Sequence, residues 1–224
     1  MIPWRAGLST RAAAARALSI ATVAGVAALL VRAWRRREPM EGQDVVELLL
    51  SRHREAERLM EDWERSTAIP DVRIGSLHEL SRRLSIHEAV EEQLVHPLVR
   101  RQLPDGHHLV ADVLAQEHES KQLLAALEDA QPGSDDHAEL VRRLFEGVRR
   151  HAHTEETLLF PALRLHLGPR ERMRLGAMVE RAERLAPTRP HPHAPSTGPG
   201  VVGMPVVGVL DRARDRVRHG QPPR

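Results

Sequence analysis

One sequence motif occurs twice in this chain of 224 residues, and it restricts the fold more than any other feature. The segment His87–Pro97 aligns without gaps on His151–Pro161, and both read His-x-x-x-Glu-Glu-x-Leu-x-x-Pro. A His and a Glu that are four residues apart lie on the same face of an α-helix. The repeat therefore predicts two helices that each present an imidazole and a carboxylate in one direction.

Each copy of the motif follows a segment that carries one further histidine. His53 lies 34 residues before His87, and His118 lies 33 residues before His151. Two helix pairs, each offering two imidazoles and one carboxylate, predict a pseudo-symmetric helical bundle around two metal ions.

The composition is typical of an all-α protein. The chain has no Tyr and only two Phe, and its β-branched and aromatic runs are too short to indicate strands. Because Cys is absent, iron–sulfur clusters, thiolate-ligated haem and disulfides are excluded. Because Tyr is absent, a tyrosyl radical and a phenolate ligand are excluded too.

Proline and glycine divide residues 44–186 into four long helices and a shorter fifth one. The breaks are expected at Ile69–Asp71, Leu103–Gly106, Gln131–Ser134 and Gly168–Pro169. Pro97 and Pro161 are predicted to kink or interrupt the second and fourth helix near their ends. The helices expected on this basis cover residues 44–65, 72–101, 107–130, 136–167 and 169–186.

Two basic tails flank the predicted bundle. Residues 1–43 carry seven Arg against two Glu, residues 187–224 carry six Arg against two Asp, and the middle of the chain has a net charge of −7. An acidic centre suits a cation-binding core. The basic residues are not interleaved with aromatic stacking residues, so nucleic-acid binding is not expected. The second tail is rich in Pro, Gly, Ser and His, which is typical of a linker, and a short helix is predicted over 206–219.

The N-terminal segment has three interpretations. Residues 17–31 are almost wholly apolar and are flanked by arginines on both sides. They form a membrane anchor or membrane-associated helix, the apolar part of an export signal, or the product of a misassigned start. As an anchor, the segment would contact the membrane through residues 12–37. The stronger arginine cluster after it would then leave the bundle in the cytoplasm.

The candidate ligands fall on the predicted core faces of their helices. His87 with Glu91, and His151 with Glu155, continue apolar seams at alternating steps of three and four residues. The apolar residues of these seams are Leu77, Leu80, Leu84, Leu94 and Leu98 in the second helix, and Val141, Leu144, Val148, Leu158 and Ala162 in the fourth. The first helix places His53 with Val46, Leu49, Leu50 and Met60, and the third places His118 with Val110, Ala111, Leu114 and Ala125.

Glutamates buried in such seams need a positive partner. A buried carboxylate costs on the order of several kcal/mol unless it is paired or bound to a metal, and neither seam contains Lys or Arg. A metal cation meets this need. The other histidines, His96 among them, are expected to be solvated or to support the site. The predicted metal ligands are His53, His87, Glu91, His118, His151 and Glu155.

Over residues 44–186 the chain resembles the hemerythrin-like (HHE cation-binding) domain. The resemblance rests on one His in each of the first and third helices, and on His-x-x-x-Glu before Pro in the second and before Phe-Pro in the fourth. It implies an antiparallel four-helix bundle that holds two non-haem iron ions. Glu91 and Glu155 would bridge the ions. The nitrogen ligands implied are His53, His87, His118 and His151.

The chain departs from the oxygen-carrying members of that family. Gln122 stands where they have a second His in the third helix, and Glu155 follows His151 by four residues rather than five. Fewer protein ligands leave more positions open on the metal, which favours redox reaction or sensing over reversible oxygen carriage. Glu88, directly after His87, is a further candidate ligand, although it lies about 100° around the helix from that residue.

The sequence leaves three functions open. The first is to sense, bind or detoxify O₂, NO or peroxide at a di-iron centre. The second is to buffer iron or another cation, and the third is a membrane-tethered interaction domain with a structural metal. Imidazole and carboxylate donors also suit Mn and Zn, while the resemblance favours iron. The sequence shows no nucleophile or phosphate-binding loop, so it does not decide whether the protein is an enzyme.

Overall fold

The structure is a computed structural model that describes residues 42–66 and 70–189. Within these ranges the chain forms helices and no strands, which confirms the all-α prediction. No helix of the described part is long and apolar enough to cross a membrane. The apolar run 17–31, the proposed membrane contact 12–37 and the predicted helix 206–219 lie outside the described residues.

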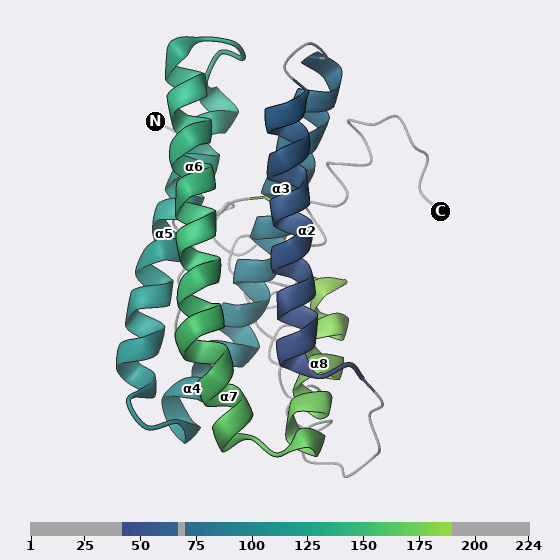
Figure 1. The fold of residues 1–224 in the computed structure, drawn as a ribbon, viewed down its shortest axis with the longest axis vertical. Helices are drawn as coiled ribbons and strands as arrows, with labels where there is room; N and C mark the ends of the chain where they lie inside the picture. The colour runs from purple at the N-terminus through teal and green to yellow at the C-terminus, as the bar shows by residue number, and fades with distance from the viewer. Residues whose placement is uncertain (1–41, 67–69, 190–224) are drawn as a thin grey trace, which may run out of the picture.

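Four long helices form an antiparallel bundle, and a shorter helix packs beside it (Figure 1). The second and fourth long helices are each interrupted by one π-helical turn. In chain order the elements are α2 (Val45–Arg65), α3 (Pro70–Val90), η1 (Glu91–Val95), α4 (His96–Gln102), α5 (Gly106–Asp129), α6 (Asp135–Thr154), η2 (Glu155–Leu159), α7 (Phe160–His166) and α8 (Pro169–Glu183).

The helices begin and end close to the predicted breaks. The Asp44 carboxylate accepts a hydrogen bond from the Val46 amide, and the Ser134 hydroxyl accepts one from the His137 amide, so both side chains cap helix N-termini. Helix α3 begins at Pro70, two residues earlier than predicted, because proline is well suited to the first turn of a helix. Pro97 likewise lies in the first turn of α4.

The long helices associate in two pairs. Helix α2 packs along α3, and α5 packs along α6 (Figure 1). Helix α8 packs against the N-terminal half of α2, next to the α4 and α7 end of the bundle (Figure 1). The predicted duplication of a helix pair is therefore present in the fold.

The apolar core is divided into two clusters along the bundle axis. One cluster includes Leu49, Val90 and Leu159 and lies near α8, and the other includes Ala56 and Leu84. Each long helix passes from one cluster to the other through a short polar stretch. On α2, for example, His53 lies between Leu49 and Ala56. A layer of polar residues is thus enclosed by apolar side chains on both sides.

The π-helical turns shift the buried face of the second and fourth helices. The predicted seams are correct as far as Glu91 and Glu155, where η1 and η2 begin. Beyond Glu155 the seam predicted for the fourth helix is wrong by one residue, since Leu158 is 52% exposed while Leu159 is buried. A π turn spans one residue more than an α turn and therefore advances the face by one position.

The close contact between α8 and the start of α2 can be tested with glycine substitutions. A Cβ atom on Gly176 would lie 1.9 Å from the Gln43 carbonyl oxygen, so Gly176→Ala forces the two helices apart. We expect a loss of about 1–3 kcal/mol and a Tm lower by roughly 2–4 °C per kcal/mol, measured by far-ultraviolet circular dichroism. Gly147→Ala in α6 is the control, because its Cβ would meet no atom nearer than 3.9 Å and should be neutral or stabilising. Equal Tm values for the two variants would contradict this packing.

Candidate metal centre

The layer between the two apolar clusters is made of ionisable side chains. Among the residues that the structure describes, every buried carboxylate and imidazole lies in or next to this layer. Glu91 and Glu155 are completely buried, and Glu117 and His96 are each 1% exposed. The buried ionisable residues are Glu88, Glu91, Glu92, Glu117 and Glu155, together with His53, His87, His96 and His151.

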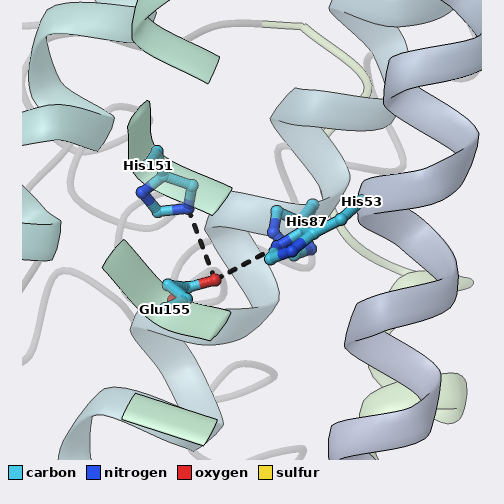
Figure 2. Close-up of side chains that lie close together, drawn as sticks. All are labelled: His53, His87, His151 and Glu155. Carbon is cyan, nitrogen blue, oxygen red and sulfur yellow. Dashed lines mark ion pairs between the residues drawn. The ribbon is translucent and has the colours of Figure 1, made fainter. Parts of the chain in front are cut away.

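One group of donors combines three imidazoles with a carboxylate. Figure 2 shows His53 from α2, His87 from α3, and His151 and Glu155 from the fourth long helix, with their side chains converging. The Glu155 Oε2 atom lies 3.2 Å from His53 Nε2 and 3.6 Å from His151 Nε2. One donor atom from each of the four residues lies within 4.8 Å of all the others. This spacing suits four ligands around a single cation.

Two further donor groups overlap with the first and are richer in oxygen. Glu91, Glu117 and His151 meet the same distance criterion, as do Glu91, His96 and Glu155. The His96 Nε2 atom lies 3.5 Å from Glu117 Oε1. Since His151 and Glu155 belong to more than one group, the donors form one continuous centre supplied by all four long helices.

Most of these donor atoms have no hydrogen-bond partner within the described part of the chain. Folded proteins rarely leave buried polar atoms unpartnered, because each one loses its hydration without compensation. A cation would coordinate these atoms, and imidazole and carboxylate donors suit Fe, Mn or Zn. The residues present therefore fit a bound metal. The unpartnered atoms are His53 Nε2, both ring nitrogens of His87, His96 and His151, and both carboxylate oxygens of Glu91, Glu117 and Glu155.

Burial sets the protonation of the donors in the metal-free protein. Burial, reinforced by neighbouring carboxylates, raises the pKa of Glu91 and of Glu117 well above the ordinary value. Burial also lowers the pKa of the His87 imidazole and of the His96 imidazole, the latter to about 4, so both rings are neutral near pH 7. Neutral imidazole is the form that binds metal.

Glu155 and His53 behave differently because they face each other. Burial acts to raise the pKa of Glu155, but the imidazoles of His151 and His53 outweigh it and hold that pKa below the ordinary value. Burial acts to lower the pKa of His53, but its contacts with Glu155 and Glu156 outweigh burial and raise the pKa. Each member of the pair therefore favours the charged form of the other.

Neighbouring side chains orient the donors. His53 Nδ1 lies 2.8 Å from Glu156 Oε1, and the Phe160 ring stacks on the His53 imidazole at a centroid distance of 5.4 Å. This leaves His53 Nε2 directed toward Glu155. On the other side of the layer, the Lys121 ammonium donates a hydrogen bond to Glu92.

The structure brings five of the predicted ligands together, but it does not place His118 with them. His118 is exposed and lies against the exposed Gln122, with 2.9 Å between His118 Nε2 and Gln122 Nε2. Helix α5 instead buries Glu117, so the core face predicted for the third helix is wrong by one residue. The face that α5 buries contains Val110, Val113, Glu117, Ser120, Leu123 and Leu124. The five ligands brought together are His53, His87, Glu91, His151 and Glu155.

A regularity in the sequence identifies Glu117. His53 precedes His87 by 34 residues, and Glu117 precedes His151 by the same number, whereas His118 does not. Glu88, the further candidate, is buried but belongs to none of the three donor groups. Burial raises its pKa to about 7, and Lys121 acts in the opposite direction.

Sequence reasoning also missed His96, which was expected to be solvated or supporting. His96 follows Glu91 by five residues, and its amide donates to the Glu91 carbonyl across the π turn. In a regular α-helix these two side chains would not share a face, but the π turn aligns them. No feature of the apolar pattern reveals such a turn in advance.

Comparisons with known proteins agree with this geometry. A sequence model of the hemerythrin HHE cation binding domain matches residues 44–163, which is more than half of the chain. The chain belongs to this family. It is 27% identical over 135 residues to an uncharacterized hemerythrin-like protein of Schizosaccharomyces pombe. The alignment covers 59% of this chain and 66% of that relative, which is just under two thirds of its length. No solved structure matches the chain.

Membership of the family supports cation binding by the donor layer, and substitutions can separate the residues involved. We expect His151→Ala to lose most of the bound metal, because His151 belongs to two donor groups. His118→Ala should retain the wild-type metal content, because that side chain is exposed. Metal per chain after iron-replete expression, measured by plasma mass spectrometry, gives the comparison. Equal losses in both variants would restore His118 as a ligand.

Metal affinity should rise with pH. The pKa values of Glu91 and Glu117 are raised, so a cation must displace protons from these carboxylates. Each proton released changes the affinity about tenfold per pH unit. We therefore expect Zn²⁺ to bind more tightly at pH 7.5 than at pH 6.5. Calorimetric titrations in two buffers of different ionisation enthalpy count the protons, and binding without proton release would contradict the prediction.

Proposed function

We propose that this protein holds two iron ions in the donor layer and binds O₂, NO or peroxide there. The observation that carries the proposal is the continuous set of seven buried donors, most of whose atoms are unpartnered. Each of Glu91, His151 and Glu155 belongs to two of the three overlapping donor groups. Shared carboxylates are the usual bridges between two metal ions in helical bundles.

The charge of the layer supports two cations rather than one. Five carboxylates are buried in or next to it, and the Lys121 ammonium pairs with Glu92 and interacts electrostatically with Glu88 and Glu117. If all five carboxylates are ionised, one divalent cation leaves a net negative charge, whereas two divalent cations with Lys121 balance the charge. Uncompensated buried charge costs on the order of several kcal/mol per group, so the balanced state is favoured.

The ligand set supports small-molecule chemistry. Mixed His and carboxylate ligation that leaves positions open on the metal is typical of non-haem iron that reacts with oxygen. When bound, iron would supply the electrons for that reaction, while the protein residues hold the ions and limit water. The apolar clusters above and below the layer shield it from solvent along the bundle axis.

A pocket connects the layer with solvent. It has a volume of about 550 Å³, and His53, His87 and His151 form part of its lining. Met60, Leu84, Ile86 and Val148 give it apolar walls, and Arg52, Arg83 and Arg149 line it as well, each paired with a glutamate. Such a pocket admits small neutral molecules to the imidazole side of the centre.

Cation buffering is the second candidate function. It is favoured by the two donor groups in which carboxylates outnumber imidazoles, since oxygen donors suit metals that are held without redox change. The two functions differ in whether the bound iron reacts with small oxidants. Neither requires a membrane, and contact with a membrane through residues 12–37 stays a prediction from the sequence.

The test uses the full chain purified without oxygen after iron-replete expression. We expect about two iron ions per chain and an absorption increase in the near ultraviolet when air or peroxide is added. NO added to the reduced protein should produce a new visible absorption. Less than one iron per chain would contradict the proposal, and stoichiometric iron that reacts with none of the three molecules would favour the buffer.

A substitution in the pocket wall tests whether small molecules reach the centre through this pocket. Ala152 lines the pocket, so Ala152→Phe should slow the reaction with peroxide while leaving the iron content unchanged. Ala126→Phe on the exposed face of α5 is the matched control and should change neither. Stopped-flow absorption gives the rates. Identical rates in both variants would show that small molecules enter elsewhere.

A further inference from the structure

The internal repeat extends to the whole donor layer at a constant offset. Adding 64 to the residue number carries His87 to His151 and Glu91 to Glu155. The same step carries His53 to Glu117. The first helix of one pair thus contributes an imidazole at the position where the first helix of the other pair contributes a carboxylate.

The contacts in the structure follow the same offset. Phe160 stacks on His53, while His96 lies 3.5 Å from Glu117. Phe160 follows His96 by 64 residues, and Glu117 follows His53 by the same number. The Phe160–His53 contact and the His96–Glu117 contact therefore occupy equivalent positions in the two halves of the pseudo-symmetric bundle. The positions are equivalent, but their chemistry differs. One is an aromatic ring on an imidazole, and the other is an imidazole beside a carboxylate.

The supporting residues differ in the same way. Glu156 accepts a hydrogen bond from His53 in one half of the centre. Its counterpart in the other half, Glu92, pairs with Lys121, the sole lysine of the chain. Each half therefore has a supporting carboxylate beside its donors, but only the carboxylate of Glu92 is paired with a lysine.

The donor layer consequently has two unlike halves. The imidazole-rich half consists of His53, His87, His151 and Glu155. The carboxylate-rich half consists of Glu91, Glu117 and His96, and it shares His151 and Glu155 with the first. In the carboxylate-rich half, both oxygens of each glutamate and both nitrogens of His96 are unpartnered, and all three residues are at least nine-tenths buried.

We propose that the two halves differ in the cation they prefer, so that the layer becomes a mixed-metal centre when both kinds of cation are supplied. The imidazole-rich half binds Fe²⁺ or Zn²⁺ and retains it. The carboxylate-rich half accepts the harder cation Mn²⁺ and exchanges its ion more readily. Imidazole suits Fe and Zn, whereas carboxylate suits Mn. This inference rests on the proposed function only in requiring that the layer holds two cations.

The first experiment loads the metal-free full chain with one equivalent of Zn²⁺ and then titrates it with Mn²⁺. Free Mn²⁺ is measured by its electron paramagnetic resonance signal, and bound Zn²⁺ by mass spectrometry after gel filtration. We expect one Mn²⁺ to bind while Zn²⁺ stays in place. A wild-type chain that binds Zn²⁺ but takes up no Mn²⁺ overturns the inference alone, whereas a chain that binds neither overturns the proposed function too.

The repeat itself supplies the variants for the second experiment. Glu117→His with His96→Phe gives the carboxylate-rich half the residues of its counterpart positions, His53 and Phe160. This variant should bind Mn²⁺ at least about tenfold more weakly and take up two Zn²⁺ ions. His53→Gln is the reciprocal control and should weaken Zn²⁺ binding at least about tenfold while changing Mn²⁺ binding little.

The pattern across the variants decides the result. Selective loss of Mn²⁺ in one and of Zn²⁺ in the other supports two unlike halves. Equal weakening of both metals in both variants overturns the inference, as does unchanged Mn²⁺ binding by the double variant. Circular dichroism confirms that each variant folds, and the wild-type titration is decisive alone should a variant unfold.

Discussion

The concentration of buried carboxylates in one layer is the constraint on which the rest of this structure depends. Five glutamates are removed from water between four helices, and the Lys121 ammonium contacts one of them, Glu92. Hydrophobic burial cannot offset such a charge, so the layer is stable only with protons or cations. The two apolar clusters hold the helices together on either side of it. The bundle therefore stabilises the site, and a bound cation in turn stabilises the bundle.

The two π-helical turns reconcile helix packing with the geometry of the centre. In a regular α-helix, His87 and Glu91 share a face, but His96 would be turned away from it. The π turn that begins at Glu91 rotates the rest of the helix by one position, so that His96 joins the donors. In the fourth helix the same rotation brings Phe160 onto His53. Proline in the first turn of α4 and α7 fits these turns, because it has no amide hydrogen to place in the helical ladder.

The sequence predicted the parts that depend on regular helical periodicity. The turns, the four long helices and the inward faces of His53, His87 and His151 follow from punctuation and from steps of three and four residues. It failed where periodicity is broken or weak. His96 lies beyond a π turn, which apolar spacing does not reveal, and α5 has a mixed pattern in which Glu117 is as plausible a core residue as its neighbour His118. The equal spacing of 34 residues in both helix pairs carried the missing information, because an equal separation across the turn places His53 and Glu117 at similar depth in the bundle.

At the equivalent positions of the two halves, packing and metal preference depend on different properties of the side chain. Packing requires only that the positions of His53 and Glu117, and those of His96 and Phe160, have side chains of suitable size. The metal responds to the donor atoms at these positions rather than to their size. An exchange of imidazole for carboxylate at one pair of equivalent positions can therefore alter the preference of half the centre while the backbone stays the same. Lys121 fits this view, because it balances the added carboxylate where the symmetric arrangement would need no lysine.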